Sequence, residues 1–412
     1  MKPTAIRKLD RYLGIPLCFL LTLYDWLKQC FRVKPTSVAA PRKILFIKLT
    51  EQGASVLAYS ALRRAAELVG QENIYFCVFS ENRPILDIMG LLKSANIFEV
   101  RHDTFPVFLR DVMRFFRDTR RLDIDTVIDM EFFSRASAGI SYLTGAGIRV
   151  GCHRYSADLP YRGNLMTHKV QYNPYIHVTY FYALLVESAL RSTSELPMPK
   201  ITYDESAIGI PFFSPSDKTR QKVLAMLKNA RVSNGNRIIL FNPNASDSLP
   251  IRKWEGKRFI ELAKRLLARH ESLTIVITGG PSERNACEEI VSTIGSPSAI
   301  SLAGHTTLEE LLALYSISNV LVTNDSGPGH FAALTNVRTV VMFGPETPGL
   351  FGPLGCNATV IWKKLACSPC VSAFNHRNTP CTRNVCMELI NVDEVLEKVE
   401  ELLGRNGITK KD

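Results

Sequence analysis

Short, almost continuously apolar stretches recur along the chain and alternate with segments of helical spacing. In the first half they cover residues 43–49, 74–79 and 126–129. A second series covers residues 237–242, 273–278, 299–302, 320–323 and 339–343. Strands buried on both faces read as continuous apolar runs, and parallel strands need crossover segments between them. The pattern therefore predicts an α/β fold with parallel sheets. Helices are expected over 54–69 and 105–121, and near Glu255, Ser282, Thr307 and Gly327.

The chain has 412 residues, of which 46% are hydrophobic and 22% charged, which excludes a disordered or low-complexity protein. This length exceeds one compact core and suits two domains. Residues 191–236 contain four prolines and Ser233-Asn-Gly-Asn236, and they mark a break in composition. We predict an extension over 1–40 and two doubly wound, Rossmann-like domains over 41–205 and 206–412. Such domains bind ligands at the carboxyl ends of their strands.

Basic residues are concentrated at the N-terminus. Residues 1–43 hold nine Lys and Arg against two Asp, whereas the whole chain has a net charge of +11. The rest of the protein is therefore close to neutral, which excludes a uniformly basic nucleic-acid binder.

An apolar run over residues 12–24 lies between the basic clusters and is followed by Trp26. It is shorter than the roughly 18 residues of a spanning helix, and no small-residue cleavage site follows it closely. We expect an in-plane helix that binds an anionic membrane surface through apolar insertion and basic side chains. The alternative is a helix packed on the body of the protein.

Three strand–helix junctions carry candidate binding residues. The first, Lys48–Leu57, has the single glycine Gly53, which permits close approach of a ligand but is not a dinucleotide fingerprint. The second includes Asn244, Ser246 and Lys253, a set suited to an oxyanion such as phosphate. Plain turns with solvated basic residues remain the alternative for both. Glu283, which begins a later helix, completes this predicted donor site.

The third junction, Asp325-Ser-Gly-Pro-Gly-His330, is the strongest signal. Free backbone N–H groups at a helix start favour an anion, and Gly327 and Gly329 leave room for a diphosphate. We expect Asp325 to bind sugar hydroxyls and Ser326 and His330 to contribute to donor binding. The alternative is that Asp325 or Ser326 is an N-cap and His330 a helix residue of the core.

Four of the ten cysteines form a cluster near the C-terminus, namely Cys367, Cys370, Cys381 and Cys386. The first pair has the CxxC spacing of zinc ligands, whereas the second is looser. A structural zinc and a disulfide pair are both possible.

The motif Asp325-Ser-Gly-Pro-Gly-His330, together with Phe343-Gly-Pro-Glu-Thr-Pro348 and Gly352-Pro353, resembles the C-terminal signature of glycosyltransferase family 9, the bacterial heptosyltransferases. The cysteine-rich stretch is similar to one common in that family, and the resemblance covers roughly residues 43–405. It implies a GT-B fold, with an acceptor-side N-terminal domain and a nucleotide-sugar donor bound by the C-terminal domain. It also implies inverting, metal-independent transfer with no cofactor needed for catalysis.

Ala54 stands where this family carries an Asp thought to deprotonate the acceptor hydroxyl. Glu51 is the nearest carboxylate in the same loop, and we predict that it is the catalytic base. His102, Asp129 and Glu131 are the next candidates.

Three functions follow from these residues. The first is transfer of a sugar, such as heptose, to a lipid-linked lipopolysaccharide or surface-glycan acceptor by a bacterial enzyme on the cytoplasmic face of the inner membrane. The second is a nucleotide-sugar epimerase or hydrolase of GT-B fold. The third is a non-catalytic partner in glycan assembly that has lost the base.

Overall fold

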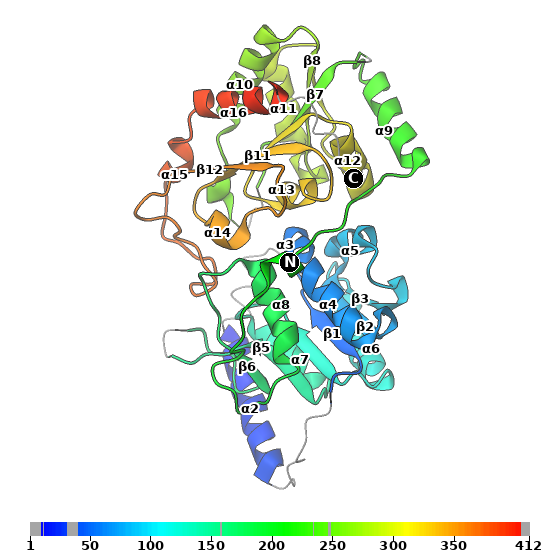
Figure 1. Cartoon of the computed structure of the whole chain (residues 1–412), viewed down its shortest axis with the longest axis vertical. Helices are drawn as coiled ribbons and strands as arrows, with labels where there is room; N and C mark the ends of the chain where they lie inside the picture. Colours follow the sequence, from blue (N-terminus) through cyan, green and yellow to red (C-terminus); the bar gives the residue numbers. More distant parts are fainter. Residues whose placement is uncertain are drawn as a thin grey trace. The chain divides into compact units, whose positions relative to one another are not determined.

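The computed structural model of the chain describes residues 10, 12–30, 40–156, 159–233, 235–245 and 249–404 (Figure 1). It divides into two compact units. Unit 1 comprises Met1–Gly209 together with Ser372–Asn378, and unit 2 comprises Ile210–Val371 together with Thr379–Asp412. A segment close to the C-terminus therefore belongs to the first unit, which the predicted domain ranges did not anticipate.

Unit 1 is built on a six-stranded sheet with the order β3-β2-β1-β4-β5-β6. Its strands are β1 (Ile44–Ile47), β2 (Ile74–Phe79), β3 (Ile97–Val100), β4 (Thr126–Asp129), β5 (Ile148–Cys152) and β6 (His168–Val170). Each pairing is parallel, and Ile44 is in register with Ile74 on one side and Thr126 on the other. The predicted parallel α/β architecture is confirmed in this unit.

Helices cover both faces of this sheet. They are α2 (Gly14–Cys30), α3 (Gln52–Leu57), α4 (Tyr59–Val69), α5 (Arg83–Met89), α6 (Phe105–Arg121), α7 (Arg135–Leu143) and α8 (Val178–Ser188). Helices α6 and α7 pack on the face that carries Leu45 and Ile47, while α4 packs against α8. The prediction of one helix over 54–69 is wrong in one respect: the N–H of Ala58 bonds to the carbonyls of both Ala54 and Ser55, and this tight turn separates α3 from α4.

Helix α2 packs on α7 through one face. Cys18 is fully buried there, and Leu17 and Leu21 lie over Gly139. The Thr22 hydroxyl accepts a hydrogen bond from the N–H of Asn164 (2.9 Å). The alternative of a helix packed on the protein's own body is therefore correct for this face. None of the described helices is both long enough and apolar enough to cross a bilayer.

Unit 2 repeats the same strand order around a second six-stranded sheet, β12-β11-β10-β7-β8-β9. Its strands are β7 (Arg237–Asn242), β8 (Leu273–Ile277), β9 (Ala299–Ser301), β10 (Val320–Asn324), β11 (Arg338–Phe343) and β12 (Ala358–Trp362). Its helices are α9 (Asp217–Asn229), α10 (Gly256–Arg269), α11 (Arg284–Ile294), α12 (Leu308–Ser316), α13 (Gly327–Ala332), α14 (Pro348–Phe351), α15 (Val385–Glu388) and α16 (Val392–Gly404). In Figure 1, α10 and α16 lie side by side, and both contribute to the core under β7 and β10.

In each sheet, the first strand of the unit lies next to the fourth, and the strand order reverses between these two strands. In open α/β sheets, ligands bind at this switch point, beyond the carboxyl ends of the strands. The loops after β1 and β4 in unit 1, and after β7 and β10 in unit 2, are therefore the places to examine.

Candidate functional site

In unit 1, Glu131 joins the two loops of the switch point. It lies just after β4, and its Oε1 accepts hydrogen bonds from the backbone N–H groups of Leu49 (2.8 Å) and Thr50 (3.2 Å), just after β1. Its Oε2 lies 3.1 Å from the ammonium nitrogen of Lys48. Since these contacts engage both oxygens, Glu131 holds the loop that carries Glu51.

Lys48 is an almost completely buried cation at the end of β1, with 2% of its side chain exposed. Burial lowers its pKa, and the neighbouring Glu131 opposes that shift. Its ammonium also contacts Oε2 of Glu51 at 3.3 Å. A cation inside the protein is stable only when it is paired, and here two carboxylates pair it.

Glu51 is the residue from which α3 begins. It has φ 72°, in the left-handed region, and 39% of its side chain remains exposed. Its Oε1 forms an ion pair with the guanidinium of Arg377, from the C-terminal segment that belongs to unit 1. The predicted base is thus solvent-accessible and at the switch point, but both of its oxygens are paired with cations. Gly53 lies buried in the first turn of α3.

Asp129, a second candidate for the base, is held inside unit 1 by a hydrogen bond and an ion pair. It is fully buried, and its Oδ2 accepts from the Ser137 hydroxyl (2.9 Å) and pairs with the guanidinium of Arg162. Burial raises the pKa of Asp129, and Arg162 opposes that shift. The third candidate, His102, lies with its Nε2 2.8 Å from Glu81 Oε1. Among the candidates, Glu51 is the most exposed, at 39% of its side chain against 30% for His102 and 15% for Glu131.

In unit 2, Asn324 joins the two switch-point loops by hydrogen bonds, as Glu131 does in unit 1. This buried side chain ends β10 and donates to the carbonyls of Pro243 (3.0 Å) and Asn244 (3.1 Å), just after β7. Its Oδ1 accepts from the N–H of Trp254 (3.0 Å). The loops after β7 and β10 are therefore fixed to each other, as predicted from their position in the strand order.

Asp325 is buried beside Arg252, with Oδ2 3.6 Å from the guanidinium. Burial raises the pKa of Asp325 to about 6, and Arg252 opposes that rise. Because the rise persists, desolvation outweighs the attraction of the cation. A carboxylate whose pKa is raised by burial at a switch point is characteristic of a functional site.

The glycines after Asp325 differ in role. A Cβ on Gly327 would lie 3.1 Å from the ring of Phe331, so a larger residue would disturb the start of α13. A Cβ on Gly329 would lie 3.5 Å from Val341, which shows that this buried glycine faces the sheet. A Cβ there would make only ordinary van der Waals contact, and the part of Gly329 in leaving room for a diphosphate remains a prediction.

Ser326 and His330, which neighbour these glycines, also direct their side chains into the protein. The hydroxyl of Ser326 donates to the carbonyl of Asn324 (3.2 Å) and does not cap α13. His330 is buried in the middle of α13.

Other predicted donor residues have contacts within the loops. The amide of Asn244 donates to the carbonyl of Thr278 (3.3 Å), and Glu283 accepts from the N–H of Gly280 (2.7 Å). Lys253 is half-buried, and its carbonyl accepts from Asn384. Ser246 lies outside the described residues. The structure therefore supplies loop-stabilising roles for Asn244 and Glu283, and their part in donor binding remains a prediction.

The clustered cysteines do not form the predicted zinc site. All four are free thiols, and Cys367 is exposed whereas Cys386 is buried, which raises its pKa. In the part of the chain that the structure describes, no three His, Cys, Asp or Glu side chains are arranged to hold a metal ion. The structure therefore lacks the donor set that a structural zinc requires, and it contains no disulfide between these residues.

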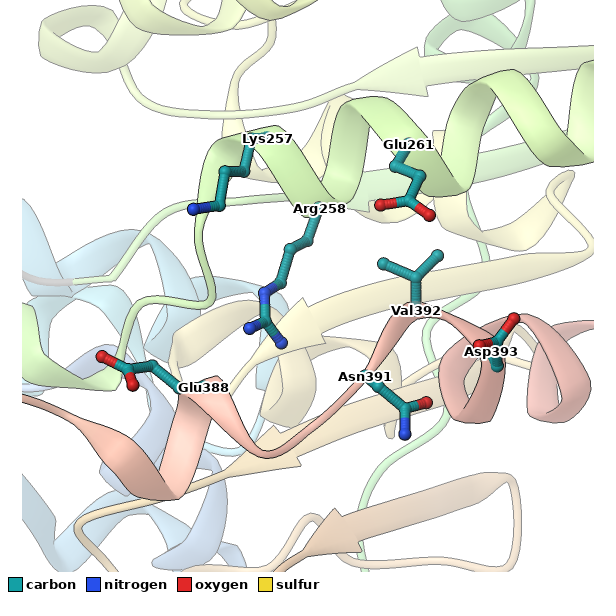
Figure 2. A pocket seen from close by; sticks show the side chains of 7 residues that line it. All are labelled: Lys257, Arg258, Glu261, Glu388, Asn391, Val392 and Asp393. Atoms are coloured by element: carbon teal, nitrogen blue, oxygen red, sulfur yellow. The ribbon is translucent and has the colours of Figure 1, made fainter.

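A pocket in unit 2 lies along α10, α15 and the start of α16 (Figure 2). Its lining residues are Lys257, Arg258, Glu261, Glu388, Asn391, Val392 and Asp393. The guanidinium of Arg258 donates to the carbonyl of Ile390, so this side chain joins α10 to the turn before α16. None of the described residues of the predicted site lines this pocket.

Sequence reasoning missed Arg377, Asn324 and the pairing role of Arg252. Asn324 precedes Asp325 in the predicted motif, so its place at a strand end was a usable signal. Arg252 lies beside Lys253 in the predicted phosphate loop. Nothing local marks Arg377, because it is 326 residues from its partner Glu51.

Comparisons with known proteins agree with this architecture. Residues 112–379 match the sequence model of glycosyltransferase family 9 (heptosyltransferase). The chain is 29% identical over 178 residues to lipooligosaccharide heptosyltransferase 2 of Campylobacter jejuni, covering 42% of this chain and 54% of that protein. It is 24% identical over 328 residues to the Haemophilus ducreyi enzyme of the same name, covering 77% and 88%.

In fold, the chain is similar to the structure of Escherichia coli ADP-heptose lps heptosyltransferase II, with a TM-score of 0.64 and 22% identity over 88% of this chain and 98% of that one. The matches to the first curated relatives span about half the length of those proteins. The two Rossmann-like units are those of a GT-B fold. Because the family match covers well over half of its residues, this chain belongs to glycosyltransferase family 9.

Proposed function

We propose that this protein is an inverting glycosyltransferase that moves a heptose from a nucleotide-activated donor to a lipopolysaccharide or lipooligosaccharide core. The observation that carries the proposal is the family match over residues 112–379, which runs through both switch-point loops of unit 2 and the end of β4 in unit 1. The curated relatives are heptosyltransferases that act on these two glycolipids.

The chemistry assigned to unit 1 is proton removal. Glu51 accepts the proton of an acceptor hydroxyl while the acceptor oxygen forms a bond to the anomeric carbon of the donor sugar. The bond from that carbon to the nucleoside diphosphate breaks, and the diphosphate leaves with the electron pair. An unactivated sugar hydroxyl is a poor nucleophile, so a positioned base accelerates this step.

The chemistry assigned to unit 2 is donor binding. Arg252 and Lys253 supply positive charge for the diphosphate, and the buried Asp325 accepts hydrogen bonds from sugar hydroxyls. The residual cost of burying Asp325 supports this role, because a ligand hydroxyl would satisfy an oxygen that Arg252 contacts only at 3.6 Å.

We further propose that the enzyme acts on the inner face of the inner membrane, held there by α2. Helix α2 also exposes large apolar side chains, among them Leu20, Tyr24 and Trp26, each 59% exposed. Together with the basic residues of 1–43, this is the composition of an interfacial helix.

Helix α6 supports the same orientation. Its exposed apolar residues Phe105, Leu109 and Met113 recur every four positions and therefore lie on one side of the helix. Arg110 and Arg114 flank them. Because α6 and α7 share one sheet face and α2 packs on α7, this basic and apolar surface belongs to the same side of unit 1 as α2.

The transfer reaction is tested with the purified protein and a panel of ADP-, UDP-, GDP- and CMP-sugars that begins with ADP-heptose. We expect one donor class to raise the melting temperature, and mass spectrometry to show one added heptose on a core-truncated glycolipid. Release of free or epimerised sugar without transfer would instead support a hydrolase or epimerase. Donor binding with no turnover would support a non-catalytic partner.

Membrane binding is tested by replacing Leu20 and Trp26 together with Ser, which leaves the buried face of α2 intact. We expect sedimentation with phosphatidylglycerol-rich vesicles to weaken about tenfold or more, because each side chain contributes over 1 kcal/mol when buried. Salt should weaken the binding of the wild type. Tyr175→Ser, at a 92% exposed site in the loop between β6 and α8, is the matched control. Unchanged sedimentation of the double variant would contradict the proposal.

A further inference from the structure

The N-terminal extension reaches the start of α7 through Asp10. The Oδ1 atom of this residue accepts hydrogen bonds from the backbone N–H groups of Arg135 (2.9 Å) and Ala136 (2.8 Å). These are the first two residues of α7, and N–H groups at such positions find no partner within their own helix. Ser134, the N-cap residue, bonds instead to the N–H of Ser137 (3.3 Å). A residue 125 positions earlier in the chain therefore completes the cap of this helix.

The second oxygen of Asp10 pairs with a buried cation. It lies 3.3 Å from the guanidinium of Arg135, whose side chain is 6% exposed, and a buried charge needs such a partner. Helix α2 packs so closely here that a Cβ on Gly14 would lie 2.7 Å from the Cβ of Arg135. The thiol of Cys18 donates to the carbonyl of Arg135 (3.6 Å). Because Asp10, Gly14 and Cys18 recur every four positions, one helical face makes all of these contacts.

Thr22, one further turn along the same face, holds a second segment. Its hydroxyl oxygen accepts from the N–H of Asn164 (2.9 Å) and lies so close to Gly163 that a Cβ there would be 2.6 Å away. The preceding residue, Arg162, donates to the carbonyl of Phe132 (2.6 Å), between β4 and α7. The extension therefore contacts both the start of α7 and the segment that holds the loop before it.

The start of α7 is in turn bonded to the loop of residues 130–134, which carries Glu131. Just before this loop, Asp129 accepts from the N–H of Glu131 (3.0 Å) and from the hydroxyl of Ser137, in the first turn of α7 (2.9 Å). The carboxylate of Glu131 holds the backbone that leads into Glu51. A shift in the first turn of α7 would therefore disturb Asp129, and with it the position of Glu131.

We infer that Asp10 is a positioning residue, through which the N-terminal extension holds the Glu131 loop in place for catalysis. The extension is then a part of the acceptor-side site and not only an anchor for the membrane. This role rests on the proposed transfer reaction with Glu51 as its base. Because a base must lie within hydrogen-bond reach of the acceptor hydroxyl, a small displacement of its loop slows the chemical step. The donor, which we assign to unit 2, should bind as before.

The kinetic test uses the full-length chain and a detergent-dispersed, core-truncated glycolipid acceptor, so that membrane anchoring plays no part. The rate constant of a single turnover at saturating donor does not depend on the fraction of folded protein, so it separates positioning from stability. In Asp10→Ala, we expect this rate constant to fall about tenfold or more, with donor affinity unchanged. Asp10→Asn keeps an oxygen for the two N–H groups of α7 and should restore part of the rate.

Asp25→Ala is the matched control. Asp25 is a carboxylate of the same extension, and it hydrogen-bonds the side chain of Tyr142, near the other end of α7. Its replacement removes the same charge from the same pair of helices, about two turns along α7 from the residues that Asp10 binds. The single-turnover rate constant of this variant should match that of the wild type.

Hydrogen exchange provides a measurement that needs no activity. In Asp10→Ala, amides of peptides covering 130–137 should exchange about 2- to 30-fold faster, the effect of losing a helix cap, while those of α8 exchange as in the wild type. If the wild type turns over and Asp10→Ala has the same rate constant, Asp10 does not position the site, whether or not exchange is faster. If the wild type transfers no sugar, the proposed function has failed instead. Exchange then decides alone: a faster rate in Asp10→Ala supports its hold on the loop, and an equal rate overturns it.

Discussion

Replacing Glu51 with Gln should lower the turnover number by about 10²–10⁴, the usual cost of losing a general base, while leaving donor affinity unchanged. The amide keeps the size of the side chain and an oxygen for Lys48, but it cannot accept a proton. Glu51 is half-exposed and lies at the switch point of unit 1. It comes directly after the backbone N–H groups that Glu131 binds. Single-turnover kinetics and a donor titration on the same sample measure the two effects separately.

Glu67→Gln is the control for this experiment. Glu67 is an exposed carboxylate on α4 that also pairs with arginines, Arg63 and Arg64, so its replacement removes the same charge from the same unit. Its turnover should match that of the wild type. Should Glu51→Gln turn over normally while donor binding falls, Glu51 serves in binding, and the base must be another residue.

The second large effect concerns stability. Arg162→Met should lower the free energy of opening unit 1 by about 3–5 kcal/mol, because it leaves the carboxylate of Asp129 buried without its counter-ion. Arg162 also donates to the carbonyls of Phe132 (2.6 Å) and Cys152 (3.2 Å), which lose their donor in the variant. Hydrogen exchange of peptides from β4 and β5 measures this opening without assuming that both units unfold together.

Two further variants separate charge from packing at this pair. Asp129→Asn combined with Arg162→Met removes both charges and should recover part of the loss. Arg42→Met removes an exposed partner of Asp125 and should cost less than 1 kcal/mol. Equal exchange in Arg162→Met and Arg42→Met would show that the buried pair adds nothing to stability.

The central strands of both sheets could be predicted from sequence because they are apolar on both faces. The expected ranges 74–79, 126–129 and 237–242 match β2, β4 and β7 residue for residue. The edge strand β9 was predicted as 299–302, whereas the edge strands β3, β6 and β12 were missed, because they are short or only partly buried. The three residues of β6 include His168 and Lys169, and most of β12 is only half-buried.

The candidate site likewise has a part that could be predicted from sequence and a part that could not. Its loops were predictable, since strand ends next to a reversal of strand order can be located from the order of elements alone. The pairing of Asp325 with Arg252 and of Glu51 with Arg377 joins residues far apart in sequence, and such contacts leave no local pattern. For the same reason, the inward direction of Gly329 could not be predicted, because it depends on the side chain of Val341 on a neighbouring strand.

The return of residues 372–378 to unit 1 sets an order for the assembly of this protein during synthesis. A chain emerges from the ribosome N-terminus first, and domains begin to fold as they emerge. The sheet of unit 1 is complete once β6 has emerged, but Phe374 and Arg377 follow some two hundred residues later. Until then Glu51 has no arginine beside it, and the rings of Phe133 and Tyr172 lack their cover. The ion pair between Glu51 and Arg377 therefore forms only after most of unit 2 has been synthesised, and a chain released before residue 377 would carry the Glu51 carboxylate without this partner.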